Sequence, residues 1–297
     1  MINVKFIGHW NSDEYIYNQF KMFTKDGLNW NSIHLAGPNE PFDFLIIVNY
    51  PRESVPISPH NTIYFAWEPI DARKHWGKFF HPNPNEFFAV YDISYTHNIP
   101  CWQISKNWKW LTENKISKNK LISGVVSDKT FSPYGEMRVG REKRISFIVN
   151  YLSRLPNYDH FGKLHYENSP FLSVKNYRGE LKNKEDGLFP YLYTFAAENG
   201  VEENYFTEKL IDGILSECYV FYSGHSSAAK HFNSKCFTLL DLDYPEVAFQ
   251  QICEEMRNCI RKDRLNEIYK EKHRILNMFS IFPLLESLFY ERGVLPQ

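Results

Sequence analysis

Short apolar runs alternate with amphipathic stretches along this chain, and that alternation limits its fold more than any other feature. Between residues 191 and 262 the order is strand, polar loop, helix, strand, loop, strand and helix. Strands that alternate with helices form parallel sheets covered by helices, so this half predicts a doubly wound nucleotide-binding unit. The expected strands are 191–197, 219–222 and 236–241, and the expected helices are 205–217 and 245–262.

The first half of the chain shows a similar pattern. Three runs rich in β-branched and aromatic residues are short enough for buried strands, at 4–8, 42–48 and 61–67. Residues 12–24 predict a helix between the first two strands. The polar stretch 127–143 predicts a connection between domains or a long surface loop, and the apolar run 144–150 predicts a further buried strand. We therefore predict an α/β fold.

Composition excludes several classes of protein. The 34 basic and 35 acidic residues of the 297-residue chain give a net charge of −1. The sequence has no basic stripe, which disfavours nucleic acid as a partner. No apolar window is long enough for a transmembrane segment, and the N-terminus lacks the pattern of a signal peptide. The five cysteines form no C-x-x-C pair, which favours a reducing compartment. We expect a soluble cytoplasmic protein whose contact with membranes is peripheral.

The loop 198–204 follows the predicted strand 191–197 and leads directly into a helix. Ligands of open α/β sheets bind at the carboxyl ends of strands, and the free N–H groups of a helix N-terminus favour phosphate. Lys209 can add positive charge there, and Glu208 can accept hydrogen bonds from ribose hydroxyls. A sugar nucleotide offers both a diphosphate and a ribose. Taken alone, however, the local pattern favours ordinary solvated helix residues at both positions.

A longer motif resembles the signature of the α1,3-fucosyltransferases, glycosyltransferase family 10. That signature has a short strand, a Glu-Asn pair, a variable loop, then Tyr-x-Thr-Glu-Lys and an apolar helix. Here Glu198-Asn199 corresponds to the pair, and Tyr205-Phe206-Thr207-Glu208-Lys209 corresponds to the second block. The loop SGHSSAAKHFNSKCFTLLDL is also similar to the family's next segment, so the resemblance covers about 191–242.

The resemblance implies a GT-B glycosyltransferase fold with two Rossmann-like domains. Residues 1–130 would form the acceptor-side domain and residues 140–265 the donor nucleotide-binding domain. Residues 266–297 would contain a C-terminal helix, interrupted near Pro283, that packs back across the junction.

The resemblance also implies roles for individual donor-side residues. Lys209 would bind the diphosphate, Glu208 would hold the ribose, and Asn199 and Tyr205 would line the nucleotide pocket. The family has an arginine after the first strand of its second domain, and in SFIVNYLSRLPNY the corresponding residue is Arg154. A guanidinium can stabilise the charge that develops on a leaving diphosphate.

Other candidates lie in loops near the predicted site. His225 and Lys230 follow the strand 219–222 and could touch the donor. The family's catalytic glutamate follows a strand of its first domain, and in YFAWEPIDARKHW the matching residue is Glu68. Trp67 and Trp76 flank Glu68 and are candidates for stacking on the acceptor. Alternative bases are Asp71, His75 and Asp92, and Glu68 also fits an ordinary turn.

The predicted function is inverting transfer of L-fucose from GDP-fucose to a glycan hydroxyl, of the α1,3 type. No cofactor or metal is expected, although Asp241-Leu-Asp243 spells a metal-binding motif of another transferase fold. The chain is similar to the compact microbial or viral family members. Two alternatives stay open, namely a GT-B transferase that uses another sugar nucleotide, and a catalytically inactive glycan-binding protein.

Overall fold

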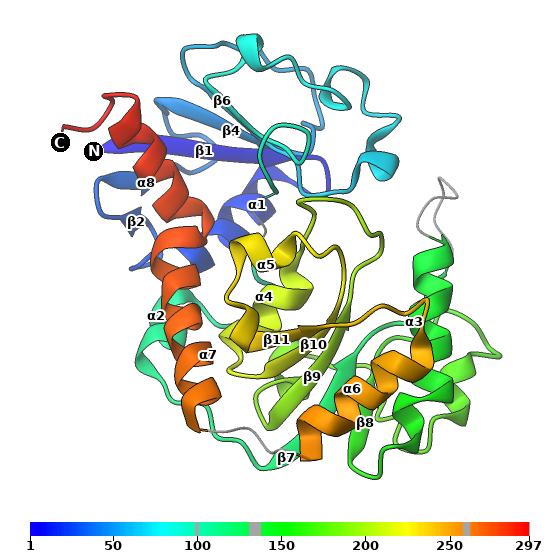
Figure 1. Cartoon of the computed structure of the whole chain (residues 1–297). Coiled ribbons are helices and arrows are strands. Elements are labelled where there is room, and N and C mark those ends of the chain that lie inside the picture. Colours follow the sequence, from blue (N-terminus) through cyan, green and yellow to red (C-terminus); the bar gives the residue numbers. More distant parts are fainter. Residues whose placement is uncertain (99–100, 131–137, 258–261, 297) are drawn as a thin grey trace. The chain divides into compact units, whose positions relative to one another are not determined.

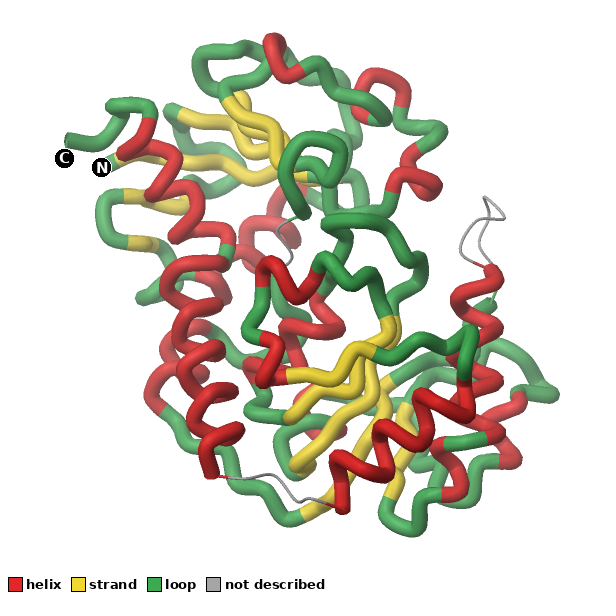
Figure 2. The backbone as a smooth tube through the Cα atoms, viewed as in Figure 1, coloured by secondary structure: helices red, strands yellow, loops and turns green. Residues whose placement is uncertain are grey.

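A computed structural model describes residues 1–98, 101–130, 138–257 and 262–296. The chain divides into two compact units (Figure 1). Unit 1 comprises Met1–Cys101, Lys106–Asn114 and Arg274–Gln297, and unit 2 comprises Trp102–Ser105 and Lys115–His273. Each unit contains its own sheet, seen as a separate group of yellow strands in Figure 2.

The sheet of unit 1 has the strand order β2-β3-β1-β4-β5-β6, and all neighbouring strands are parallel except β2 and β3. Its strands are β1 (Ile2–Gly8), β2 (Asn29–Trp30), β3 (Ile33–Leu35), β4 (Phe44–Val48), β5 (Thr62–Phe65) and β6 (Ala89–Tyr91). Every residue of β4 and β5 is buried, which explains their nearly continuous apolar sequences. The three strands expected from the sequence are confirmed as β1, β4 and β5.

The sheet of unit 2 is entirely parallel, with the order β11-β10-β9-β7-β8. Its strands are β7 (Lys120–Val125), β8 (Tyr158–Phe161), β9 (Tyr191–Ala197), β10 (Tyr219–Ser223) and β11 (Phe237–Leu239). The predicted strands at 191–197, 219–222 and 236–241 are confirmed as β9, β10 and β11. Strand β7 belongs to this sheet, although the sequence analysis assigns residues 1–130 to the first domain.

Helices flank both sheets. The α-helices are α1 (Asp13–Phe20), α2 (Trp108–Glu113), α3 (Arg138–Asn150), α4 (Glu208–Leu215), α5 (Ala228–His231), α6 (Pro245–Arg257), α7 (Lys262–Arg274) and α8 (Ile281–Glu291). Helix α1 packs on β1, and α4 packs on β9 and β10 (Figure 1). The predicted helices at 12–24 and 205–217 are confirmed as α1 and α4. The predicted helix at 245–262 is confirmed as α6 up to Arg257, and residues 258–261 lie outside the described part. Pro283 lies in the first turn of α8, just after the helix break at Ser280.

The short helical segments are 3-10 turns, apart from one π-helix. The 3-10 turns are η1 (Lys21–Phe23), η2 (Ile70–Arg73), η3 (Gly77–Phe79), η4 (Pro84–Glu86), η5 (Leu152–Arg154), η6 (Pro170–Ser173), η7 (Lys184–Gly187) and η8 (Ser234–Cys236). The π-helix η9 (Ile275–Phe279) precedes α8.

The predicted strand at 144–150 is wrong, because these residues form the second half of α3. Their apolar positions also fit a helix: Ile145, Ile148 and Leu152 are buried and are spaced three and four residues apart. A short apolar run does not distinguish a strand from a buried helix. The polar stretch 127–143 is likewise not a loop throughout, since α3 begins at Arg138, and residues 131–137 lie outside the described part.

Strand β8 contains a fully buried histidine that should make stability depend on pH. The Nδ1 atom of His160 lies 2.9 Å from the Tyr158 hydroxyl, and burial lowers the pKa of His160 to about 3. Between pH 6.5 and 3 the unfolded chain binds a proton at this residue that the folded chain does not. The free energy of unfolding should therefore fall with decreasing pH, by about 1.4 kcal/mol per pH unit from this residue alone.

Thermal unfolding between pH 7.5 and 4.5 checks this expectation. His160→Gln should show a shallower pH dependence than the wild type, and replacement of the exposed His60 by glutamine should preserve the wild-type slope. Equal slopes for His160→Gln and wild type would contradict the assignment.

Candidate functional site

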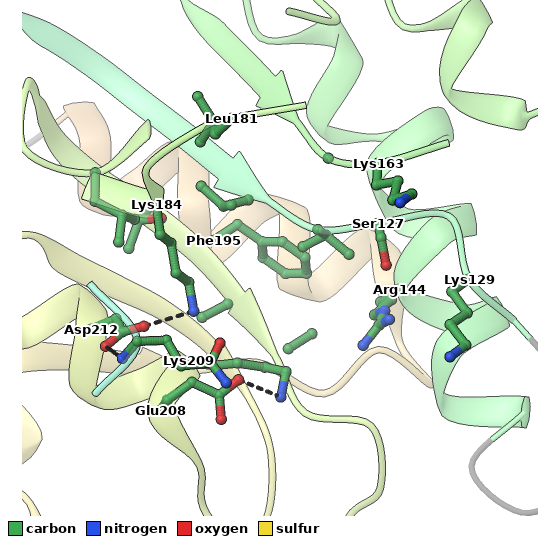
Figure 3. A pocket seen from close by; sticks show the side chains of 18 of the residues that line it. Ser127, Lys129, Arg144, Lys163, Leu181, Lys184, Phe195, Glu208, Lys209 and Asp212 are labelled. Atoms are coloured by element: carbon green, nitrogen blue, oxygen red, sulfur yellow. Dashed lines mark hydrogen bonds and ion pairs between the residues drawn. The ribbon is translucent and has the colours of Figure 1, made fainter. Parts of the chain in front are cut away.

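Unit 2 contains a cavity of about 570 Å³ at the carboxyl ends of β7, β8 and β9 (Figure 3). Its lining includes Val125, the last residue of β7, and Val126 and Ser127, which follow it. Gly162 and Lys163 follow β8, and Asn199 lies two residues after Ala197, the last residue of β9. In the sheet order, β8 and β9 lie on opposite sides of β7. The cavity therefore lies at a topological switch point, where open parallel sheets bind ligands.

The start of α4 is fixed by a buried glutamate. Glu198, 4% exposed, accepts hydrogen bonds from the Thr207 backbone N–H at 2.8 Å and the Thr207 hydroxyl at 2.7 Å. The Tyr222 hydroxyl donates to the same carboxylate at 3.1 Å. Thr207 in turn is the N-cap of α4, because its hydroxyl accepts from the Lys209 backbone N–H. Glu198 thus couples the end of β9 to the first turn of α4.

Glu208 and Lys209 both line the cavity from this first turn. The ammonium of Lys209 lies 3.3 Å from a carboxylate oxygen of Glu208 and 3.3 Å from one of Glu198. Burial would raise the pKa of Glu208, but Lys209 and Lys184 outweigh it and lower that pKa to about 2. Glu208 is therefore ionised at neutral pH, and both of its carboxylate oxygens can accept hydrogen bonds.

One turn further along α4, Asp212 is fully buried and also borders the cavity. Lys184 on η7 forms an ion pair with it at 2.7 Å, and the Gln103 backbone N–H donates to it at 2.9 Å. Burial raises the pKa of Asp212. Neither Asp212 nor Lys184 was predicted from the sequence as a site residue. The available signal was an aspartate on the buried face of the amphipathic helix, four residues after Glu208.

Arg144 supplies a buried cation from α3 (Figure 3). Its Nη1 donates to the Asn199 side-chain oxygen at 2.7 Å, and within the described residues it forms no ion pair with a carboxylate. Burial, with a contribution from Arg141, lowers the pKa of Arg144 to about 10, so it stays charged at neutral pH. Gly140 permits the close approach, because a Cβ atom there would lie 2.8 Å from the Asn199 carbonyl oxygen.

The lining of the cavity is strongly cationic. Seven basic and three acidic side chains contribute to it: Lys129, Arg141, Arg144, Lys163, Lys182, Lys184, Lys209, Glu180, Glu208 and Asp212. Glu208 and Asp212 lie beside Lys209 and Lys184, whereas Arg144 and Lys129 lie on the opposite side in Figure 3. This excess of positive charge suits an anionic ligand such as a diphosphate.

The structure places Asn199, Glu208 and Lys209 together around the cavity but not the other predicted donor-side residues. Arg154 is exposed, with its guanidinium 4.9 Å from the centre of the Tyr151 ring. This follows from the helical conformation of 144–150, which brings Arg144 rather than Arg154 to the cavity. Tyr205 is buried beside the cap of α4.

The two predicted loop residues also lie off the cavity lining. His225 Nδ1 lies 2.9 Å from the Ser227 hydroxyl. Lys230 is exposed and forms an ion pair with Glu203 at 3.0 Å.

The predicted acceptor-side residues lie at the carboxyl end of β5 in unit 1. Glu68 is half-buried in the loop that follows β5. The Trp67 backbone N–H donates to the Asn49 side chain at 2.8 Å, and the Trp76 ring lies 5.0 Å from that of Tyr50.

The alternative bases differ in accessibility. Asp71 forms an ion pair with Lys74 at 2.9 Å, and His75 is exposed. Asp92 is completely buried against Arg73, so it is not accessible as a base.

The Asp-x-Asp sequence forms a turn after β11. The Asp243 backbone N–H donates to Asp241 at 2.9 Å, and the Asp243 carboxylate pairs with Lys143. Among the residues that the structure describes, no three His, Cys, Asp or Glu side chains are grouped as metal ligands. In the same part of the chain, no helix combines the length and apolarity needed to cross a membrane.

Comparison with known proteins identifies relatives among glycosyltransferases. No protein-family profile matches the chain. The α-(1,3)-fucosyltransferase FucT of Helicobacter pylori is 41% identical over 66 residues, which is 22% of this chain and 14% of that protein. The resemblance to the α1,3-fucosyltransferases is thus confirmed over a segment that spans about one seventh of the curated relative.

Solved structures extend the likeness to the whole fold. A crystal structure of an α1,3-fucosyltransferase matches with a TM-score of 0.53 and 17% identity, covering 98% of this chain and 88% of that one. The lipopolysaccharide outer core galactosyltransferase WaaB matches with a TM-score of 0.54 and 9% identity, covering 98% and 100%. The chain therefore has the two-sheet α/β fold of GT-B glycosyltransferases.

Proposed function

We propose that this protein is an inverting glycosyltransferase that transfers L-fucose from GDP-fucose to a glycan hydroxyl, with an α1,3 linkage. The observation that carries the proposal is the cationic cavity of unit 2, whose lining includes Arg144, Lys209 and the ionised Glu208. The segment containing Glu208 and Lys209 is also the one that resembles the α1,3-fucosyltransferases.

Both cationic and anionic side chains of the cavity would bind the donor. Lys209 and Arg144 would bind the diphosphate, while Glu208 would accept hydrogen bonds from the ribose. Arg144 also orients the Asn199 amide through the 2.7 Å hydrogen bond, so that its NH₂ group can donate to the nucleotide. The surrounding lysines and Arg141 would add to the attraction for the donor.

The same cations would lower the barrier to transfer. As the bond between the sugar C1 and the diphosphate breaks, negative charge develops on the leaving phosphate oxygens. Arg144 and Lys209 are fixed before the reaction by contacts with Asn199, Glu198 and Glu208, so they require little reorganisation to stabilise that charge. In this scheme the positive charge that stabilises the leaving diphosphate comes from the protein's own side chains.

The acceptor hydroxyl must lose a proton as its oxygen attacks C1. Glu68 at the carboxyl end of β5 is the proposed base in unit 1, and Trp67 and Trp76 are the proposed aromatic contacts of the acceptor. Their positions after a parallel strand support this assignment, because substrates of α/β folds bind at that edge.

Nucleotide selectivity tests the donor. At one hundred times its Kd, GDP should stabilise the protein by about 2.7 kcal/mol and raise Tm by about 4 °C. UDP, ADP and CMP at the same concentration should have much smaller effects. Selectivity for UDP or ADP would instead support a GT-B transferase with another sugar nucleotide.

Release of GDP distinguishes turnover from binding alone. Wild-type protein should release GDP from GDP-fucose, and the Lys209→Ala variant should not. If wild type binds glycans yet releases no GDP, and Lys209→Ala binds the same glycans equally well, the protein is an inactive glycan-binding member of the fold.

A further inference from the structure

Unit 1 has a topological switch point of its own. From β1 the chain first forms β3 on one side of β1 and then crosses to form β4 on the other side. In doubly wound sheets, ligands bind at the carboxyl ends of the two strands that flank such a point, which here are β1 and β4. The cationic cavity of unit 2 occupies the equivalent position beside β7 and β9. One sheet of this chain therefore already has a cavity at its topological switch point.

Aromatic rings gather at this edge of unit 1. His9 directly follows β1 and Tyr50 follows β4, and their rings stack at 4.0 Å with an interplanar angle of 13°. The Trp76 ring lies 5.8 Å from His9 and 5.0 Å from Tyr50. Asn49, between β4 and Tyr50, has a left-handed backbone with φ of 64°, a conformation that is enriched at functional sites.

Two polar atoms at this edge of unit 1 are left without partners among the described residues. Within the described residues, the buried His9 Nδ1 and the buried Trp67 Nε1 make no hydrogen bond. Unsatisfied buried polar groups are rare in native proteins, and they are often found at binding or catalytic sites. Burial also lowers the pKa of His9, so that the imidazole is neutral at pH 7 and can accept a hydrogen bond.

We propose that His9 is an acceptor-binding residue, whose imidazole accepts a hydrogen bond from a hydroxyl of the acceptor sugar while Tyr50 and Trp76 pack against the sugar ring. The inference rests on the proposed function, since it assigns the acceptor of that reaction. The three rings of His9, Tyr50 and Trp76 include no permanently charged group, in contrast to the cationic lining of the cavity in unit 2. These aromatic rings and the neutral imidazole fit a neutral pyranoside. The C–H face of the sugar would lie on an aromatic ring, and one sugar hydroxyl would donate to the imidazole.

Steady-state kinetics with GDP-fucose and either lactose or N-acetyllactosamine test the role of His9. His9→Phe should raise the KM for the acceptor at least tenfold and leave the GDP-induced rise in Tm unchanged. His9→Gln should recover part of the loss, because its amide oxygen can accept the same hydrogen bond. His34→Gln is the matched control, since His34 is a half-buried histidine on β3 of the same sheet, and it should leave the acceptor KM unchanged.

A binding measurement that needs no turnover separates this inference from the proposed function. Saturation-transfer NMR would use methyl β-galactopyranoside, methyl N-acetyl-β-glucosaminide and methyl α-mannopyranoside with wild type and His9→Phe. Signal from at least one sugar in wild type, lost in His9→Phe, supports the inference even if GDP-fucose is not the donor. Absence of signal from all three sugars in wild type, or equal signal in both proteins, overturns it. The GDP-induced rise in Tm reports independently on the proposed function.

Discussion

Replacing Arg144 by glutamine should reduce kcat/KM for the donor by about 10²–10³-fold. Arg144 is the buried cation of the cavity that has no carboxylate ion pair within the described residues, so its charge is available for the diphosphate. Affinity for GDP should fall by about 10–100-fold, since charge-assisted hydrogen bonds are lost. Donor-dependent GDP release and calorimetric titration with GDP would measure the two effects.

Two further variants make this result interpretable. Arg154→Gln removes the arginine predicted from the sequence, which is exposed and lies off the cavity lining, and it should leave both quantities unchanged. Arg144→Lys keeps the charge but loses the planar fork, so its activity should lie between wild type and Arg144→Gln. A large loss in Arg154→Gln together with a normal Arg144→Gln would reverse the assignment of the donor arginine.

The second large effect concerns stability of unit 1. Arg73 and Asp92 form an ion pair in which both side chains are fully buried, and the Ser94 backbone N–H donates to Asp92 at 2.7 Å. Asp92→Ala should destabilise the protein by about 3–5 kcal/mol, because it leaves the guanidinium buried without its counter-charge. Urea unfolding followed by tryptophan fluorescence would measure the loss.

The exposed pair Asp71–Lys74 is the comparison for this prediction. Its ammonium and carboxylate are 2.9 Å apart, but both side chains are about half exposed. Asp71→Ala should therefore lower the free energy of unfolding by only about 0.5 kcal/mol. The double variant Arg73→Met/Asp92→Leu should recover much of the loss, since it removes both buried charges. Equal costs for Asp92→Ala and Asp71→Ala would show that burial of the Arg73 pair has no energetic consequence.

Sequence reasoning was most reliable where local periodicity was strong. The helix around Glu208 was predictable because Leu210, Ile211 and Ile214 place a continuous apolar face on β9 and β10. The same regularity made the strand before it recognisable, so Asn199 and Lys209 could be assigned to one edge of a sheet.

Contacts between distant parts of the chain were not predictable in this way. Arg144 was missed because an apolar run of seven residues fits both a strand and one face of a helix. Asp212 and Lys184 are 28 positions apart, and only the tertiary fold brings them into an ion pair. The pairing of Arg73 with Asp92 likewise leaves no local pattern in the sequence.

The interleaved division of the chain has a consequence for any attempt to isolate unit 2. Trp102–Ser105 belongs to unit 2, although the residues on both sides of it belong to unit 1. Two buried carboxylates of unit 2 depend on this short stretch, since Asp212 accepts the Gln103 N–H and Glu185 accepts the Ser105 N–H at 3.0 Å. A fragment that starts at residue 115 would lack both donors and one wall residue of the cavity. No single cleavage of the backbone therefore yields all of unit 2 as one fragment.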